Sequence, residues 1–282
     1  MRYLITGANG MLGRDLQKAL EGRDVTALSR AELDVTDLEA VRAASAHRDV
    51  IINAAAYTRV DDAESQEDVA YAVNATGPAN LARAAAEHGA KLVQLSTDYV
   101  FDGTATEPYT EDAPVNPVSA YGRTKAEGER LARQHNPQTY VVRTAWLYGR
   151  HGSNFPKTML RLAIERDQLR VVTDQVGQPT WSRDLADQIV AMLDGGAPPG
   201  NYHGTNSGQA SWYEFAQAIL SLAGHDPDKV TPAESSHFVR PAPRPSYSVL
   251  GHAAWTTAGL APMRHWREAL ASAAGTGVWE HE

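Results

Sequence analysis

Short apolar runs alternate with amphipathic stretches through the first half of the chain. The runs have the length of strands and are rich in aliphatic residues, which is typical of strands buried on both faces of a sheet. Between them, apolar residues recur at helical spacing; Leu12, Leu16 and Leu20 share one face of a helix predicted over 11–20. Strands are predicted at 3–5, 25–28, 50–52, 91–95 and 140–142, and further helices at 75–87 and 119–133. This alternation predicts an α/β fold with a Rossmann-type, doubly wound parallel sheet.

The second half of the chain is less regular. A last strand at Asn201–His203 is predicted to return to the sheet. Residues 240–245 contain three prolines, which exclude a helix or a sheet ladder there. The other predicted elements are helices at 154–164 and 182–193 and a strand at 169–172.

The composition is that of a globular protein without cysteine. Of the 282 residues, 43% are hydrophobic and 21% are charged, so a core of normal size is expected. The net charge of −8 argues against nucleic acid as a partner, because phosphate backbones require a basic surface. The absence of cysteine excludes disulfides, thiolate metal ligands and a thiol nucleophile. No apolar run approaches the about 18 residues of a membrane span, and the N-terminal run is too short for a signal peptide; we therefore expect a cytoplasmic protein without a membrane partner.

A glycine-rich segment, Gly7–Gly13, follows the first predicted strand and opens the first predicted helix. In dinucleotide-binding folds such glycines permit the tight turn, the approach of backbone to a pyrophosphate and close helix–sheet packing, and the helix N–H groups face the phosphates. The spacing is GxxGxxG rather than GxGxxG. A glycine-rich turn without a ligand is the alternative, which the position directly after the first strand disfavours. The cofactor-binding candidates in this segment are Gly7, Asn9, Gly10, Met11, Leu12 and Gly13.

Ser29 and Arg30 follow the second predicted strand. Folds that bind NAD usually place an acidic residue here, which binds the ribose 2′-hydroxyl. Ser29 and Arg30 instead suit a 2′-phosphate, so NADPH is the expected cofactor and NADH the alternative; a solvated surface charge is the other interpretation of Arg30. Asp34 and Val35 come where the adenine would lie, and Asp37 is equally suited to cap a helix.

Tyr121 and Lys125 are four residues apart in a predicted helix and so share one of its faces. A nearby ammonium favours the phenolate, so the pKa of Tyr121 is expected to fall from about 10 toward neutrality. A tyrosine tuned in this way gives a proton to an oxygen that gains charge during hydride transfer. Thr97 ends the fourth predicted strand, where hydroxyls point into the ligand crevice, and is expected to hydrogen-bond a substrate carbonyl. The alternatives are an exposed helix pair for Tyr121 and Lys125 and a strand-end cap for Thr97.

Together these features resemble the extended short-chain dehydrogenase/reductase superfamily and, more narrowly, the dTDP-4-dehydrorhamnose reductase family. The wider resemblance lies in the glycine-rich segment, in residues 34–37, 53–56 and 73–74, and in the Tyr121/Lys125 pair. The narrower one lies in AYT, VD and AE within 56–64, STDYVFDG at 96–103, RTAWLYG at 143–149 and DQVGQPT at 174–180. The resemblance runs from Met1 to about Leu250.

The resemblance implies roles for individual residues. Thr97, Tyr121 and Lys125 form the catalytic set, in which Tyr121 donates the proton and Lys125 supports it while contacting the cofactor ribose. Asp98 and Trp146 line the sugar site. The implied cofactor contacts are Gly10, Met11 and Leu12 for the pyrophosphate, Asp34 and Val35 for the adenine end, and Ala54, Ala55, Ala56 and Tyr57 for the nicotinamide side. The implied reaction is the NAD(P)H-dependent reduction of the 4-keto group of dTDP-4-dehydro-L-rhamnose to dTDP-L-rhamnose.

A nucleotide diphosphate needs cations and hydrogen-bond donors. Arg240 and Arg244 flank the proline-rich segment and are candidates to clamp the diphosphate, with solvated loop arginines as the alternative. Trp146 and Trp181 are candidates for flat walls of the sugar or base site, and a core role is equally open for each. The candidates to read the base are Asn154, Gln175 and Gln178.

With these assignments the chain divides into two parts. The expected division is an NAD(P)-binding Rossmann domain over 1–150, with a return of about 180–225 to it, and a smaller C-terminal substrate-binding region of 151–179 and 226–282. Some family members are described with Mg²⁺ held by Glu residues at a dimer contact; the matching positions here are Asp15 and Asp184. Because no metal-ligand cluster is visible in the sequence, no metal ligand is assigned, and monomer and homodimer both stay open. Gly251 stands where the family usually has Asp.

Other functions share this fold and cofactor. Tyr99 stands where dehydratases carry the second acid of an Asp–Glu pair, and epimerases usually have a small residue in place of Asp98, so both rank behind a reductase. A closer alternative is a 4-ketoreductase for another dTDP-4-keto-6-deoxyhexose, since motifs do not separate stereochemical outcomes. A non-catalytic NADP-binding regulatory subunit is disfavoured, because such relatives typically have a degraded Tyr/Lys pair.

Overall fold

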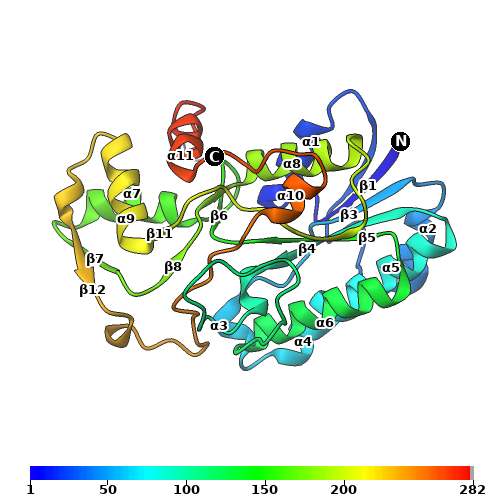
Figure 1. Cartoon of the computed structure of the whole chain (residues 1–282), viewed down its shortest axis with the longest axis horizontal. Helices are drawn as coiled ribbons and strands as arrows, with labels where there is room; N and C mark the ends of the chain where they lie inside the picture. Colours follow the sequence, from blue (N-terminus) through cyan, green and yellow to red (C-terminus); the bar gives the residue numbers. More distant parts are fainter. Residues whose placement is uncertain (280–282) are drawn as a thin grey trace.

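Six parallel strands form one sheet in the order β10-β5-β4-β3-β1-β2 (Figure 1). The computed structural model describes residues 1–279. β1 pairs with β2 on one side and β3 on the other, so the strand order reverses there, and doubly wound sheets bind ligands outside the carboxyl ends of the strands at such a point. The strands are β1 (Arg2–Thr6), β2 (Asp24–Leu28), β3 (Val50–Asn53), β4 (Lys91–Thr97), β5 (Thr139–Thr144) and β10 (Gly200–His203). The predicted fold class is confirmed, as is the predicted return of residues 201–203 to the sheet.

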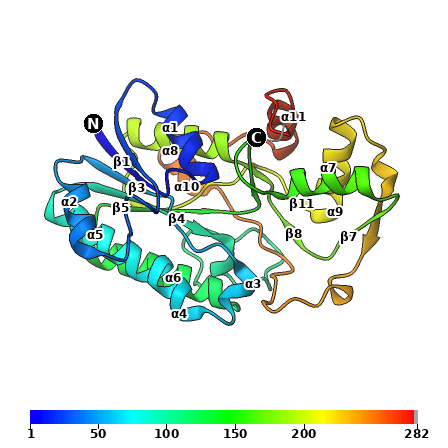
Figure 2. The ribbon, with the colours of Figure 1, turned by 180° about the vertical axis from the view of Figure 1, so that it is seen from behind.

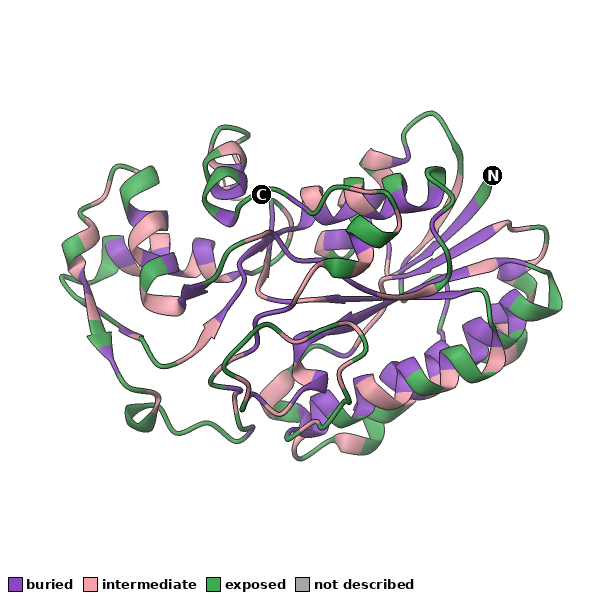
Figure 3. Ribbon diagram, viewed as in Figure 1, coloured by how far each residue is buried: buried purple, intermediate pink, exposed green. Residues whose placement is uncertain are grey.

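Alternate residues of each strand point to opposite faces of the sheet, and each face has its own core. Tyr3 and Ile5 of β1 pack with α1 and α8, whereas Leu4 packs with α2 and α5. Because both faces are covered, the central strands β1, β3, β4 and β5 are mostly buried, whereas the edge strands β2 and β10 are partly exposed (Figure 3). We call the sheet and its helices the sheet domain (Figures 1 and 2). One face carries α1 (Met11–Ala19), α8 (Ser182–Asp194) and α10 (Ala253–Thr257), the other α2 (Leu38–Ser45), α5 (Gly77–Glu87) and α6 (Ala120–His135), and α3 (Val60–Ala63) and α4 (Glu67–Tyr71) lie against α6.

A second core lies beside the sheet domain and defines what we call the smaller region (Figure 1). Phe215 of α9 is fully buried in it, and β7 pairs in parallel with β12. The predicted return of about 180–225 is made by α8 and β10, whereas α9 packs in this second core. Of the predicted region 226–282, residues 280–282 lie outside the described residues. The elements are α7 (Phe155–Glu165), β7 (Leu169–Val172), α9 (Trp212–Leu222), β12 (Val230–Ala233) and α11 (Trp266–Ala274), with short paired strands β6 (Leu147–Tyr148) and β9 (Thr180–Trp181), and β8 (Val176–Gly177) and β11 (Ala210–Ser211).

Several helices begin at side chains that cap them. Asp37 accepts hydrogen bonds from the N–H groups of Glu39 and Ala40, so its capping role is confirmed. Ser119 caps α6 through the N–H of Gly122 and thereby sets where that helix starts. Among the helices of residues 1–279, none combines the length and the apolar character that crossing a bilayer requires.

Candidate active site

The glycine-rich turn joins β1 to α1 and lies against the loop that follows β3. Gly7 has φ +71°, and a Cβ at this position would come within 2.6 Å of the Ala55 nitrogen. A Cβ at Gly13 would come within 2.3 Å of the Gly7 carbonyl oxygen, so α1 packs directly on the turn. Gly10 precedes α1 without a side-chain cap, which leaves the first N–H groups of the helix to an anion. The residues present therefore fit the pyrophosphate of a dinucleotide.

The segment after β2 differs from the prediction. The backbone N–H and the hydroxyl of Ser29 both donate to a carboxylate oxygen of Glu32, at 2.9 and 2.7 Å. The donors that Ser29 was predicted to offer to a 2′-phosphate are therefore taken by an acidic side chain, while Arg30 is exposed. Asp34 accepts from the N–H and the hydroxyl of Thr36, and these hydrogen bonds lower the pKa of its carboxyl.

Asn74 holds the loop after β3 in place. It accepts from the Tyr57 N–H at 2.9 Å and donates to the Tyr57 carbonyl oxygen at 3.0 Å and to Thr124 of α6 at 3.2 Å. Asn74 lies in a π-helical turn (Ala72–Thr76), a conformation found frequently at functional sites. The loop of residues 54–57, predicted for the nicotinamide side, is thereby tied to the helix that carries Tyr121.

Tyr121 lies beside Thr97 because α6 closely approaches the short helical turn after β4. At Gly122 a Cβ would come within 2.2 Å of the Tyr99 carbonyl oxygen, so this approach requires glycine. Tyr121 lies close enough to Thr97 for that residue to lower the pKa of the phenol, and the Thr97 hydroxyl donates to Asp98 at 2.9 Å. The structure thus brings together the predicted proton donor, the strand-end threonine and the aspartate after it.

Burial shifts the pKa values of Lys125, Asp98 and Tyr121. Lys125 is buried one turn further along α6, and its ammonium donates to the Leu95 carbonyl oxygen at 2.6 Å. Burial lowers the pKa of Lys125 to about 8 and raises the pKa of Asp98 to about 6. Burial also raises the pKa of Tyr121 to about 12, although Thr97 acts to lower it. The predicted fall of the Tyr121 pKa toward neutrality is therefore wrong, because desolvation raises this pKa and the nearby charge of Asp98 raises it further.

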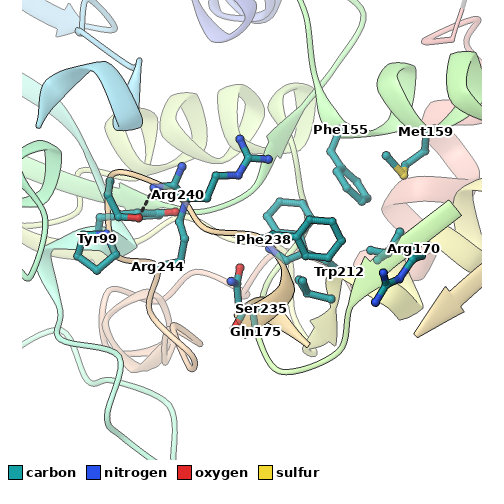
Figure 4. Close-up of a pocket in the computed structure, with 14 residues that line it drawn as sticks. Tyr99, Phe155, Met159, Arg170, Gln175, Trp212, Ser235, Phe238, Arg240 and Arg244 are labelled. Carbon is teal, nitrogen blue, oxygen red and sulfur yellow. Dashed lines mark hydrogen bonds between the residues drawn. The ribbon is translucent and has the colours of Figure 1, made fainter. Parts of the chain in front are cut away.

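A cavity of about 510 Å³ opens between the sheet domain and the smaller region (Figure 4). Tyr99, Arg240 and Arg244 lie at one end of it, and Trp212, other aromatic and apolar side chains and Arg170 at the other (Figure 4). The Tyr99 ring meets the Tyr121 ring edge-on, with 5.7 Å between the centroids, so the cavity ends one ring away from the predicted proton donor. Flat apolar walls beside arginines suit a planar base attached to an anionic diphosphate.

The two arginines predicted for the diphosphate line this cavity, as does Gln175. Arg244 and Arg240 both form ion pairs with the carboxylate of Asp61 in α3, at 3.0 Å and 3.6 Å. Arg244 also donates to the Ala242 carbonyl oxygen at 3.2 Å. The structure therefore places both arginines at this cavity and pairs them with a residue from the sheet domain.

Other predicted substrate residues have different surroundings. Trp146 stacks on Trp212 with 3.6 Å between the ring centroids, so it backs the cavity wall. Gln178 is buried, and its side-chain oxygen accepts from the Leu250 N–H and from Thr205, both at 2.8 Å, so the prediction that it reads a base is corrected. Trp181 is buried in the core of the smaller region. Asn154 caps α7 and donates to the Gly149 carbonyl oxygen, which likewise gives it a structural role.

The positions that match the family's metal contact are engaged in internal bonds. Asp15 accepts from the Ser182 hydroxyl. Asp184 pairs with Arg264 at 2.8 Å and accepts from Asn206. Within residues 1–279 no group of three or more His, Cys, Asp or Glu side chains has an arrangement that would hold a metal ion.

The family described as "RmlD substrate binding domain" matches residues 1–277. The chain belongs to this family. It is 52% identical over 278 residues to a dTDP-4-dehydrorhamnose reductase of Streptomyces griseus, across 95% of this chain and 91% of that protein. It is 51% identical to a probable dTDP-4,6-dihydroxy-2-methyloxan-3-one 4-ketoreductase of Streptomyces antibioticus, across 97% and 94%. The crystal structure of a dTDP-4-dehydrorhamnose reductase from Bacillus anthracis in complex with NADP superposes with a TM-score of 0.93 at 40% identity, across 96% and 98% of the two chains.

The family resemblance drawn from the motifs is confirmed. This RmlD-family protein is an NAD(P)-dependent oxidoreductase, and its relatives place it among the 4-ketoreductases of dTDP-linked sugars. The names of those relatives divide between dTDP-4-dehydrorhamnose reductases and reductases of other dTDP-4-keto-6-deoxysugars.

Several residues of the site escaped the sequence interpretation. Asp61 falls within the VD motif of the family resemblance, but the residues next to it in the sequence do not predict that it pairs with two arginines. Glu32 lies close to the expected acidic position after the second strand and was a recoverable signal. Other cavity residues come from elements that are distant in sequence and carry no local motif, among them Phe155, Met159, Arg170, Trp212 and Phe238.

Proposed function

We propose that this RmlD-family protein reduces the 4-keto group of dTDP-4-dehydro-L-rhamnose to give dTDP-L-rhamnose, with NADPH as the hydride donor. The observation that carries this proposal is the position of Tyr121 one ring beyond the arginine-lined end of an aromatic cavity. A nucleotide sugar has the same order of parts, with a planar base, an anionic diphosphate and then the sugar carbonyl. We propose accordingly that the sheet domain holds the cofactor and that the smaller region, with residues 151–179 and the segment after 226, holds the nucleotide.

The cofactor would lie along the carboxyl edge of the sheet. The N–H groups of Met11 and Leu12 at the start of α1 would receive its pyrophosphate, and the loop of residues 54–57 would face the nicotinamide. NADPH supplies the hydride when it is bound. The NADP complex of the Bacillus anthracis relative supports this choice of cofactor.

Tyr121 would deliver the proton. Because burial raises its pKa to about 12, the phenol is fully protonated at neutral pH, which is the state a proton donor needs. A carbonyl oxygen that becomes an alkoxide is far more basic than the tyrosinate, so the proton moves from Tyr121 to that oxygen as charge develops. The Lys125 ammonium then stabilises the tyrosinate by its positive charge, and the buried setting strengthens that attraction.

The test is NADPH oxidation with freshly prepared dTDP-4-dehydro-L-rhamnose, followed by absorbance and by identification of the product. Tyr121→Phe is expected to lower kcat by about 10²–10⁴-fold, since it removes the proton but little volume. The Kd for NADPH should stay unchanged. Tyr71→Phe, at an exposed tyrosine of α4, is the matched control and should behave as the wild type. Undiminished turnover in Tyr121→Phe would overturn the assigned role.

A second candidate is the reduction of another dTDP-4-keto-6-deoxysugar. The observation in its favour is that identity to a 4-ketoreductase of this other kind, 51%, is nearly equal to the 52% found for a dTDP-4-dehydrorhamnose reductase. A panel of dTDP-4-keto sugars separates the two candidates: the sugar with the highest kcat/KM, and the configuration of its product at C4, identify the substrate.

A further inference from the structure

Asp61 joins two parts of the chain that are far apart in sequence. Its Oδ1 accepts from the Arg244 guanidinium at 3.0 Å and from the Ala242 N–H at 3.3 Å, and its Oδ2 lies 3.6 Å from Arg240. The Asp61 and Arg244 side chains are both mostly buried, with 26% and 21% of their surfaces exposed. One carboxylate of the sheet domain therefore receives both a backbone donor and two cations from one loop.

That loop, residues 238–245, forms a wall of the substrate cavity. After β12 it runs from the smaller region to the neighbourhood of α3 (Figures 1 and 2). Val239 near the start of this loop is 95% exposed, and three prolines keep residues 240–245 out of regular structure. Further along, Pro245 packs against Gly103, and Ser246 donates to the Gly103 carbonyl oxygen at 2.9 Å. Asp61 thus lies at the point where the loop first meets the sheet domain.

The contact also fixes the direction of Arg244. Its guanidinium carbon lies 5.9 Å from the centre of the Tyr99 ring, which in turn meets the ring of Tyr121. The guanidinium of Arg244 is held by Asp61 and by the Ala242 carbonyl oxygen. Because its orientation is already fixed, the side chain has little rotamer entropy left to lose when an anion binds.

We propose that Asp61 is a positioning residue for substrate binding, which anchors the 238–245 loop to the sheet domain and holds Arg244 ready for the diphosphate of the substrate. This inference rests on the proposed function for the identity of the substrate. It assigns Asp61 no contact with the reacting atoms. The consequence is an effect on the binding of the nucleotide rather than on the chemical step.

The experiment compares Asp61→Ala, Asp61→Asn, Arg244→Ala and the double variant Asp61→Ala/Arg244→Ala with the wild type. Asp62→Ala is the matched control, since Asp62 lies next to Asp61 in α3, is exposed and pairs with Arg59. The measurements are KM and kcat for the keto sugar, the Kd of dTDP by calorimetry, and the Kd of NADPH.

Asp61→Ala should raise KM and the Kd of dTDP by about tenfold or more, with kcat at saturation and the Kd of NADPH nearly unchanged. Asp61→Asn should lose less, because its amide oxygen still accepts from Ala242 and Arg244. In the Arg244→Ala background, Asp61→Ala should add little, since it acts through that arginine. The Asn variant also keeps the test open if the Ala variant does not fold.

Three outcomes would overturn the proposal: Asp61→Ala behaving like Asp62→Ala, full multiplication of the two single effects in the double variant, or tighter dTDP binding in Asp61→Asn. The last would show that the carboxylate competes with the diphosphate for the arginines. Because dTDP binding is measured without turnover, a wild type that binds dTDP but reduces no keto sugar would count against the proposed function and leave the comparison of Asp61 variants decisive.

Discussion

At the scale of single residues, desolvation governs the catalytic group. Tyr121 and Lys125 are both buried, and burial moves their pKa values in opposite directions, upward for the phenol and downward for the ammonium. The pKa of Tyr121 is about 12, so this residue stays protonated at physiological pH. Above neutral pH the charge that changes is therefore that of Lys125, whose pKa is about 8, whereas Asp98, whose pKa is about 6, titrates on the acidic side.

The pKa of Lys125 predicts a fall of kcat at alkaline pH, the alkaline limb of the pH profile. The Lys125 ammonium is present below about pH 8 and is lost as the pH rises through that value, so kcat should fall above about pH 8. The measurement is kcat against pH between 6 and about 10, with buffers of constant ionic strength. Lys125→Arg keeps a positive charge that does not titrate here, and in whatever activity it retains the limb should be absent. A limb that persists unchanged in this variant would assign the titration to another group.

At the scale of elements, the catalytic residues depend on how tightly α6 packs. The helix meets the turn after β4 at Gly122, where a Cβ would lie 2.2 Å from the Tyr99 carbonyl oxygen. Further along α6, Glu129 forms a two-pronged ion pair with Arg143 of β5, at 3.0 and 2.8 Å, and both side chains are fully buried. Arg143 also approaches His203 of β10, so one buried polar group links the helix to two strands.

Gly122→Ala should push α6 away from the turn and displace Tyr121. Overpacking of this kind costs about 1–3 kcal/mol of stability, and a misplacement of about 1 Å costs about 10² in rate. Urea unfolding and kcat measure the two effects. Gly200→Ala is the control, because a Cβ there meets nothing within 4 Å. Equal stability and activity in both variants would show that the turn adapts to α6.

Glu129→Ala should lower the free energy of unfolding by about 3–5 kcal/mol, because it leaves the Arg143 charge buried without its partner. Glu127→Ala on the same helix removes a largely exposed pair with Arg130 and should cost at most about 0.5 kcal/mol. Chemical denaturation of both variants provides the comparison. A similar loss in the two would mean that the buried pair adds nothing beyond an exposed one.

At the scale of the whole molecule, the proposed ligands bind to different parts. The glycine-rich turn belongs to the sheet domain, and the cavity lies between that domain and the smaller region. A ligand that binds only the folded state stabilises it by mass action, so each ligand should leave its own thermal signature. The cavity ligand should additionally tie the two parts together.

NADPH at 100 times its Kd should stabilise the protein by about 2.7 kcal/mol, which corresponds to a rise in Tm of about 5–11 °C for a chain of this size. Adding dTDP should raise Tm further. Differential scanning calorimetry with NADPH and NADH at equal concentrations also shows how strong the preference for a 2′-phosphate is when Glu32 occupies the donors of Ser29. The absence of any shift with either dinucleotide would contradict the cofactor assignment.

The sequence by itself determined what depends on local spacing. Hydrophobic periodicity predicted the six strands of the sheet domain and its helices α1, α5, α6 and α8, but not the shorter helices α2, α3, α4 and α10. The glycine-rich turn joins two consecutive elements and the Tyr121/Lys125 pair lies within one helix, so both could be recognised from neighbours along the chain. The tertiary structure alone decided which polar groups are free to act. The side-chain oxygen of Gln178 is occupied by the N–H of Leu250, 72 residues further along the chain. Asp61 meets Arg244 although 183 residues separate them. Such partners are set by packing between elements, and the same packing, through desolvation, reversed the expected shift in the pKa of Tyr121.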